Sequence, residues 1–306
     1  MASSHDSRCR GGSGRPPDAA TAQAGGGEDA SRRADGTPSA LDELVRLVAA
    51  GVGYRGLAPE LIAAVGAREL SKRRNVKEAV KATRSKLHQV AGAYFTRQEY
   101  DRWLGMLREA ATTGSRDDLK AVCRAIMGHH ASTRERLPIL DELYASTLAG
   151  IGPIRRVLDV ACGLNPLALP WMPLAPDAEY IAYDVYPELA AFLDAALPLL
   201  GVRGVARVAD VTATPPEQHV DVALVLKALP CLEQLDKSAS TRLLDALNAE
   251  YVLVTYPVRS LGGRRKGMVA TYDAHLRQLV EGRDWTVRRY DFASELAYVI
   301  AKGGAR

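Results

Sequence analysis

Three acidic residues in the second half of the chain belong to short apolar runs. Asp159, Asp184 and Asp210 each lie in or directly after a run of the kind that forms a buried strand. In an α/β sheet, ligands bind just beyond the carboxyl ends of the strands, where the chain turns into a helix. An acid at the end of the second strand is well placed to accept hydrogen bonds from the hydroxyls of a ribose. Together the three acids predict a nucleoside pocket.

The turn after the first run distinguishes two nucleoside cofactors. Ala161, Cys162 and Gly163 are small enough for the backbone to approach a ligand, and Gly163 can adopt a positive φ without a Cβ penalty. A dinucleotide site typically has G-x-G-x-x-G around its pyrophosphate. This turn has one glycine and continues with Asn165 and Pro166. S-adenosylmethionine carries no phosphate, so we favour it over NAD. An ordinary α/β core whose acids only cap helices is the plainer alternative.

Composition narrows the class of protein. The 306 residues suffice for two domains, and 47% hydrophobic with 25% charged residues is usual for a soluble globular protein. No apolar run approaches about 18 residues, and the N-terminus lacks a secretory signal, so we expect no membrane partner. Four scattered cysteines without a C-x-x-C pair indicate reduced thiols in a cytoplasmic protein and no metal site. A net charge of +4 means that any nucleic-acid surface must come from local clustering.

The chain divides into three predicted parts. Residues 1–38 are rich in Gly, Ser, Ala, Pro and Arg and are predicted to form a disordered tail, because they cannot bury enough surface to offset their ordering entropy. Residues 39–150 have helical periodicity and predict a separate helical domain. Residues 151–306 alternate between strand and helix, which predicts an α/β, Rossmann-like, mostly parallel sheet. Helices are predicted from Leu41, at 61–70 after Pro59, from Asn75 to about Tyr94, and at 98–111, 116–127 and 132–148. Strands are predicted at 155–160, 179–184, 204–209, 221–227, 250–255, 284–290 and 295–301.

Two basic segments indicate contact with phosphates. In the first, Lys77, Lys81 and Arg84 recur at helical spacing on one face, and such a stripe can track a nucleic-acid backbone. In the second, three cations lie between glycines in a loop after the fifth predicted strand. A solvated surface is the plainer alternative for both. The candidate RNA-binding residues are Lys72, Arg73, Arg74, Lys77, Lys81, Arg84, Lys86, Arg264, Arg265, Lys266 and Met268.

The first residues of the helix predicted at 132–148 include a possible N-cap and a cation. Ser132 or Thr133, followed by Glu135, resembles a capping arrangement. Arg134 would then lie in the first turn, where the helix dipole disfavours a cation. A cation in that place indicates an anionic partner, and the carboxylate of the cofactor is a candidate. His130, just before the helix, is interpreted as part of the pocket wall or core.

Four strings together resemble one family, the aminoglycoside-resistance 16S rRNA methyltransferases that modify N7 of guanine 1405 in the decoding site of the 30S subunit. The resemblance extends over roughly residues 40–302, and it is greatest to the self-resistance enzymes of actinomycete aminoglycoside producers; the long N-terminal tail departs from the shorter members. The strings are 130–138, 161–167, 226–233 and 260–268.

The resemblance implies a cofactor, a substrate and a set of residues. The cofactor would be S-adenosylmethionine, and the substrate 16S rRNA in the assembled 30S subunit, bound by a protein that we expect to be monomeric. Lys227 and Glu233 would serve either the cofactor or the target. Glu295 would accept hydrogen bonds from guanine N1–H and the 2-amino group, unless it is a surface strand residue. The cofactor contacts would be Tyr94, His130, Arg134, Asp159, Ala161, Gly163, Asp184, Asp210, Val211, Leu226 and Gln234.

The residues after the fourth predicted strand agree with a guanine N7 target. Methylation of an exocyclic amine usually needs an Asn/Asp-Pro-Pro-aromatic turn there, but this chain has Lys227-Ala-Leu-Pro230. Guanine N7 already has an exposed lone pair and no proton, so alignment with the methyl group can supply much of the rate without a general base. The base must still be extruded from its helix. Three alternatives remain: an adenine 1408 N1 methyltransferase, a small-molecule methyltransferase, and a non-catalytic RNA-binding factor.

Overall fold

The computed structural model describes residues 38–89, 99–258 and 267–303. Within those ranges, seven strands form one sheet in the order β3-β2-β1-β4-β5-β7-β6. All neighbours are parallel except β7, which is antiparallel to both β5 and β6. The predicted α/β class and each of the seven predicted strands are confirmed. The strands are β1 Ile154–Val160, β2 Leu174–Asp184, β3 Arg203–Val208, β4 Val220–Leu226, β5 Ala249–Pro257, β6 Trp285–Asp291 and β7 Glu295–Lys302.

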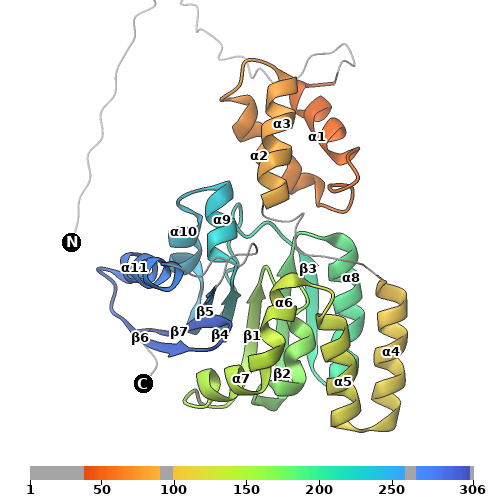
Figure 1. Cartoon of the computed structure of the whole chain (residues 1–306), viewed down its shortest axis with the longest axis vertical. Helices are drawn as coiled ribbons and strands as arrows, with labels where there is room; N and C mark the ends of the chain where they lie inside the picture. The colour runs from red at the N-terminus through yellow and green to blue at the C-terminus, as the bar shows by residue number, and fades with distance from the viewer. Residues whose placement is uncertain (1–37, 90–98, 259–266, 304–306) are drawn as a thin grey trace, which may run out of the picture. The chain divides into compact units, whose positions relative to one another are not determined.

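Helices precede the sheet and connect its strands (Figure 1). The α-helices are α1 Ala40–Ala49, α2 Pro59–Leu70, α3 Val76–Leu87, α4 Tyr100–Thr113, α5 Arg116–Met127, α6 Ala131–Arg136, α7 Leu140–Leu148, α8 Pro187–Ala196, α9 Leu229–Leu235, α10 Ala239–Ala246 and α11 Met268–Val280. Short 3-10 helices are η2 Leu137–Ile139, η3 Asn165–Trp171 and η4 Leu197–Leu200. No helix in the described part of the chain is long and apolar enough to span a membrane.

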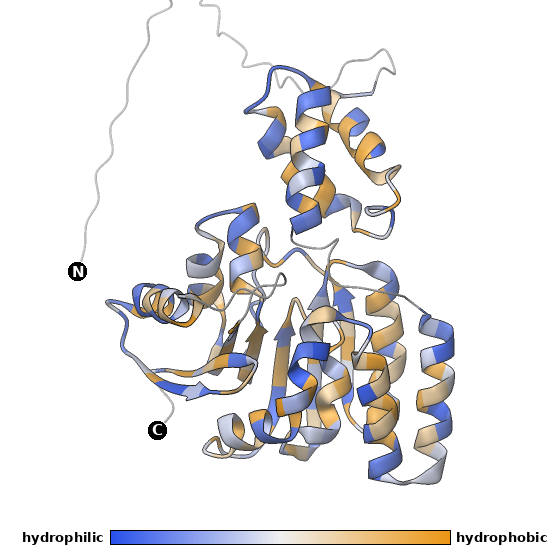
Figure 2. Ribbon diagram, in the orientation of Figure 1, coloured by the Kyte–Doolittle hydropathy of each residue, from blue (hydrophilic) through white to orange (hydrophobic). Residues whose placement is uncertain are grey.

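The first three helices follow the sequence signals closely. Pro59 is the first residue of α2, where its missing N–H is not needed, and Asn75 caps α3 by accepting from the backbone N–H of Glu78 at 2.9 Å. α1–α3 bury their apolar faces in one core that includes Leu44 and Ile62. Figure 2 shows hydrophobic and hydrophilic residues on different faces of these helices.

Alternating side chains of the strands supply the cores on the two faces of the sheet. On β1, for example, Val157 joins one cluster while Leu158 and Val160 join the other, as the two-residue period of a strand requires. The first cluster includes residues of α4, α5, α7 and α8, and the second includes residues of α9, α10 and α11. Helices α4, α5 and α8 lie side by side (Figure 1).

Two sequence expectations about the helices need comment. The helix predicted at 132–148 is three pieces, α6, η2 and α7, because Pro138 lacks an N–H and cannot continue an α-helix. Helices α4, α5 and α7 share a core with the sheet, through side chains such as Trp103 and Tyr144. The core of α1–α3 also includes Leu235 of α9. The helices before residue 150 therefore share both of their cores with later segments, and independent folding of 39–150 stays a prediction. The predicted tail lies, up to residue 37, outside the described residues.

Candidate active site

A cavity of about 340 Å³ lies where β1, β2 and β4 end. It brings together side chains from the turn after β1, the end of β2, the loop after β3, α9 and the start of α6. This is the place at which an α/β sheet binds its ligand. The predicted site residues that line it are His130, Ala161, Gly163, Asp184, Asp210, Val211, Leu226, Lys227, Gln234 and Met268.

Backbone groups hold Asp184 in place at one end of the cavity. The N–H of Gly163 donates to its Oδ2 at 2.8 Å, and the N–H of Val185 donates to its Oδ1 at 2.7 Å. Gly163 has φ +51°, and a Cβ there would lie 2.9 Å from the ring of His130. Glycine is therefore required both by the backbone conformation and by the close approach of His130. Burial lowers the pKa of His130 to about 3, so its imidazole is neutral near pH 7.

Asp210 presents an unused acceptor. Its Oδ1 accepts from the N–H of Thr212 at 2.9 Å and from the Thr212 hydroxyl at 2.6 Å. Its Oδ2 is buried and has no hydrogen-bond partner in the described part of the chain. Because a buried polar atom without a partner costs free energy, this oxygen is suited to accept from a ligand N–H.

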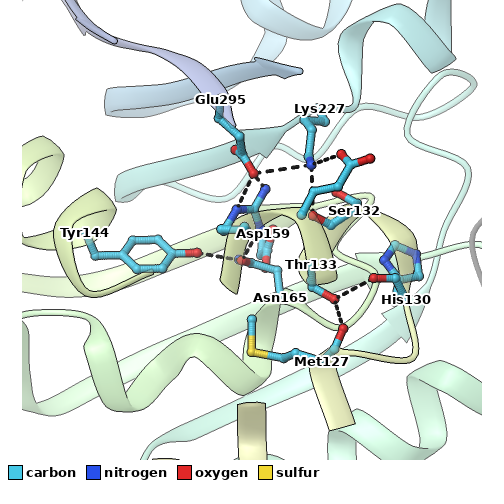
Figure 3. Close-up of polar contacts among 11 residues, drawn as sticks. Met127, His130, Ser132, Thr133, Tyr144, Asp159, Asn165, Lys227 and Glu295 are labelled. Atoms are coloured by element: carbon cyan, nitrogen blue, oxygen red, sulfur yellow. Dashed lines mark hydrogen bonds and ion pairs between the residues drawn. The ribbon is translucent and has the colours of Figure 1, made fainter. Parts of the chain in front are cut away.

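Lys227 directly follows β4 and has an uncommon backbone conformation, φ +58°. Its Nζ donates to the carbonyl of Ser132 at 2.8 Å and to Oε2 of Glu135 at 2.9 Å, and lies 3.3 Å from Oε1 of Glu295 (Figure 3). The side chain is 8% exposed. Three acceptors thus fix its ammonium group, which ties β4 to α6 and β7.

The same network continues through Arg136, which also lines the cavity. Its guanidinium donates twice to Glu295, at 2.9 and 3.2 Å, and once to Oδ1 of Asn165, at 2.7 Å. Arg136 is 1% exposed and Glu295 is not exposed. Burial opposes ionisation of Glu295, but Arg136 and Lys227 outweigh it and hold the pKa of the carboxyl below its ordinary value. The result is a buried, matched set of charges.

Asp159 lies at the far end of this network. Its Oδ2 accepts from the amide of Asn165 at 2.8 Å and from the hydroxyl of Tyr180 at 2.6 Å, and Figure 3 shows its side chain beside Asn165. The residue is fully buried, and burial raises the pKa of its carboxyl to about 7. Asp159 therefore holds Asn165, just after the turn that follows β1, and does not line the cavity.

The comparison with known families decides which proteins this chain is related to. Residues 51–299 match the family model described as ribosomal RNA methyltransferase (FmrO). The chain belongs to this family. The resemblance inferred from the four sequence strings is confirmed.

The match between this chain and its relatives extends over nearly the whole length of each relative. A 16S rRNA (guanine(1405)-N(7))-methyltransferase of Frankia casuarinae is 40% identical over 86% of this chain and 94% of the relative. One with the same name from Micromonospora echinospora is 35% identical over 86% of this chain and 97% of the relative. The crystal structure of the 16S rRNA methyltransferase RmtF with S-adenosyl-L-homocysteine is similar with a TM-score of 0.74 and 30% identity, over 87% of this chain and all of that one.

Several predicted residues of this family member lie elsewhere than expected. Asp159 is not among the residues that line the cavity, and Arg134 is exposed and also absent from the lining. Glu233 pairs with Nε2 of His275 at 2.8 Å rather than lining the cavity. Both oxygens of Glu295 are engaged by Arg136, so the predicted contact of Glu295 with guanine does not match this geometry. Tyr94, Arg264, Arg265 and Lys266 lie outside the described residues.

The predicted cap of α6 was wrong. The N-cap is His130, without a side-chain cap hydrogen bond, and the helix begins at Ala131. Thr133 instead donates its hydroxyl to the carbonyls of Met127 and His130, at 2.6 and 3.2 Å. Arg134 is therefore one turn into the helix and not at its first residues, which removes the dipole argument for an anion beside it.

Sequence reasoning missed Arg136. Ser132, Glu135 and Arg136 all line the cavity, and they are spaced at i, i+3 and i+4 on one face of α6. Arg134 is on another face. The sequence shows this spacing, but it does not show which face of the helix lines the cavity. That is known only from the contacts of Ser132 and Glu135 with Lys227.

The basic residues of α3 and of the turn before it fall into two groups. Lys72, Arg74, Lys77 and Lys81 are exposed, and no ion pair joins them to other described residues. Others are held by the protein itself. Arg73 and Lys86 contact the buried Glu69 at 3.1 and 3.3 Å, and Arg84 donates to the carbonyl of Leu47 near the end of α1. Arg84 thus satisfies a helix terminus and does not extend the exposed stripe.

Proposed function

We propose that this protein transfers the methyl group of S-adenosylmethionine to N7 of guanine 1405 of 16S rRNA, and so confers resistance to aminoglycosides of the kanamycin and gentamicin type. The observation that carries the proposal is the cavity at the ends of β1, β2 and β4, in a chain that matches the family over residues 51–299. The names of the relatives supply the base and the atom.

The lining of the cavity fits an adenosine. Asp184, at the end of β2, is the acceptor for the ribose hydroxyls, and the vacant Oδ2 of Asp210 suits the amino group of adenine. Val211 and Leu226 give the ring apolar neighbours. The bound cofactor supplies a methyl group on a sulfonium, which is electrophilic without further activation. RmtF, which is similar over all of its length, was crystallised with the demethylated product S-adenosyl-L-homocysteine.

The acceptor side of the reaction needs positioning rather than proton transfer. Guanine N7 has a lone pair and no proton, so the enzyme has to align it with the methyl group, and proximity can lower the barrier greatly. Lys227 does not serve as a base, because its ammonium already donates to Ser132 and Glu135 and lies beside Glu295. We assign Lys227, Arg136 and Glu295 to shaping the floor of the cavity.

The substrate we propose is the assembled 30S subunit, bound by a monomeric protein in the cytoplasm. The exposed cations Lys72, Arg74, Lys77 and Lys81 provide contacts for phosphates, and a folded RNA surface is recognised by shape more than by sequence. The predicted loop with Arg264, Arg265 and Lys266 would add contacts near the cavity, since it directly precedes α11, whose first residue Met268 lines it.

The deciding experiment measures transfer of labelled methyl from S-adenosylmethionine to purified 30S subunits, with naked 16S rRNA in parallel. Borohydride–aniline cleavage then maps 7-methylguanosine. We expect label on 30S alone, with cleavage at guanine 1405. Label without cleavage would indicate adenine N1 or another atom, and absence of label on both RNAs would indicate a small-molecule acceptor. Absence of S-adenosylmethionine binding in a titration would indicate a non-catalytic RNA-binding factor.

A further inference from the structure

The cavity extends past the residues assigned to adenosine. Pro257 at the end of β5, Cys231 on α9, and Met268 and Tyr272 on α11 also line it. In the sheet, β4 separates β5 from β1 and β2, so this group and Asp184 are at the two ends of the cavity with Lys227 between them. If adenosine occupies the Asp184 end, the end with Tyr272 is left for the methyl acceptor.

Tyr272 is held there by a stacked pair of rings. Its ring lies 4.7 Å from that of Tyr256, measured between centroids, with 18° between the ring planes. Tyr256 is on β5 and is fully buried. Its hydroxyl lies 3.3 Å from Nδ1 of His275, whose Nε2 lies 2.8 Å from Oε1 of Glu233. Residues of β5, α9 and α11 therefore fix the plane of the Tyr272 ring. Its phenol is neutral near pH 7, as for an ordinary tyrosine, and burial raises its pKa further.

The proposed reaction creates a charge that an aromatic ring can stabilise. The lone pair of guanine N7 forms the new N–C bond as the S–C bond of the sulfonium breaks. Sulfur becomes a neutral thioether, and the positive charge passes to the guanine, with no proton transferred. A cation over the face of an aromatic ring is stabilised by the ring quadrupole. Because the guanine acquires this charge only as it reacts, the interaction is stronger in the transition state than in the ground state and accelerates the step.

We propose that Tyr272 is the platform on which the extruded guanine stacks, and that its ring, backed by Tyr256, stabilises the charge that develops on the base. The inference rests on the proposed function. It assigns the acceptor site to the Tyr272 end of the cavity and explains why a neutral aromatic ring, backed by the buried Tyr256, lines that end rather than a carboxylate or an ammonium. Extruded bases are bound in this way by stacking on aromatic side chains.

Three substitutions of Tyr272 test the ring itself. Tyr272→Leu should lower kcat/KM for methyl transfer to 30S subunits by about 5- to 150-fold, the factor that corresponds to one lost base–aromatic stack. Tyr272→Phe and Tyr272→Trp keep a ring and should stay within about threefold of wild type by the same reasoning. Affinity for S-adenosylmethionine, measured by calorimetry, should be unchanged in all three. Tyr290→Leu, which removes a half-buried tyrosine from β6 outside the cavity lining, is the matched control and should transfer methyl like wild type.

The outcomes separate the alternatives. Wild-type rates with Tyr272→Leu would overturn the proposal. So would a Phe variant as slow as Leu, because the hydroxyl would then be the active part, and so would weaker cofactor binding, which would place Tyr272 at the cofactor end. Wild-type protein that labels 30S at guanine 1405 shows that a negative result for Tyr272 concerns this inference alone.

Nucleotide binding tests the proposal when methyl transfer cannot be measured. In Tyr272→Trp, 7-methylguanosine 5′-monophosphate should quench the added indole fluorescence more than guanosine 5′-monophosphate does, relative to wild type with its own three tryptophans. Equal or absent quenching would overturn the proposal even if the Leu variant did not fold. If wild type failed to methylate 30S, so that the proposed function failed, this titration would still report on Tyr272 by itself.

Discussion

Charged side chains serve opposite purposes in α1–α3 and around the end of β4. In the turn between α2 and α3 and on α3 itself, Lys72, Arg74, Lys77 and Lys81 are exposed and unpaired within the described ranges. Around β4, charged groups are buried and matched to one another. Exposed cations contribute little to folding and remain available for a partner. Buried charged groups hold a fixed geometry, and removing the partner of one of them costs free energy because the other charge is left uncompensated.

In the proposed function, this difference would let one chain dock on a large RNA and still align two small reacting groups. Phosphate contacts by long exposed side chains tolerate small shifts of the partner, and their strength depends on salt. The end of β4 tolerates no such freedom, since Lys227 with φ +58° must place its ammonium among three acceptors. The two regions should therefore respond differently to the same kind of substitution.

The largest expected effect comes from breaking the buried set of charges. Arg136→Met leaves Glu295 buried with Lys227 as its remaining cation, and it should lower the free energy of unfolding by about 3–5 kcal/mol. Urea denaturation measures this loss. The control is Arg134→Met, an exposed arginine on another face of α6, which should change stability by no more than about 0.5 kcal/mol. Adding Glu295→Gln to Arg136→Met should restore part of the loss. Equal losses for the two single variants would contradict the comparison.

A smaller loss is expected at the turn beside Asp184. Gly163→Ala must hold φ +51° and also place a Cβ 2.9 Å from His130, so it should destabilise the protein by about 1–3 kcal/mol and weaken S-adenosylmethionine binding. Gly114→Ala is the matched control, because Gly114 has φ +66° but open space around it. That variant should show the backbone strain without any loss of cofactor affinity in calorimetry. Weakened binding in both would mean that general destabilisation, and not the close approach of His130, limits the site.

The buried acid gives a dependence on pH. Burial raises the pKa of Asp159 to about 7, above the ordinary value of about 4, so between these pH values the folded state binds more protons than the unfolded state. The contribution of this group to the free energy of unfolding is fully present below about pH 4 and is lost as the pH rises to 7. The free energy of unfolding falls there by at most about 1.4 kcal/mol per pH unit. Asp159→Asn should remove this slope in urea denaturation measured from pH 5 to 8. A slope that is unchanged in the variant would assign it to other groups.

The sequence was sufficient where a feature depends on neighbours along the chain. The apolar runs predicted every strand, and the position of Asp184 at the end of one run placed it in the cavity. Asn75 and Pro59 likewise act locally, as a cap and a first helical residue.

It was insufficient where distant segments decide what a side chain meets. Glu295 begins β7, but its burial depends on β7 inserting antiparallel between β5 and β6, which sets Glu295 opposite Pro257. The stack of Tyr272 on Tyr256 likewise joins α11 to β5 and has no signal in either segment alone. The choice between Arg134 and Arg136 depended on where α6 begins, and that start has neither a side-chain cap nor a proline to mark it in the sequence.

The exposed cations should give the smallest change in stability and the clearest change in salt dependence. Lys77→Ala and Lys81→Ala should each leave the free energy of unfolding within about 0.5 kcal/mol of wild type. Each should also reduce the slope of log affinity for 30S subunits against log salt by about 1, because one phosphate contact is lost. Arg84→Ala is the contrasting variant on the same helix. It removes the donor to the Leu47 carbonyl, so it should lower stability by about 1 kcal/mol and leave the salt slope unchanged. If Arg84→Ala changed the slope as much as Lys81→Ala, the division of this helix into cations that hold the fold and cations that contact RNA would be wrong.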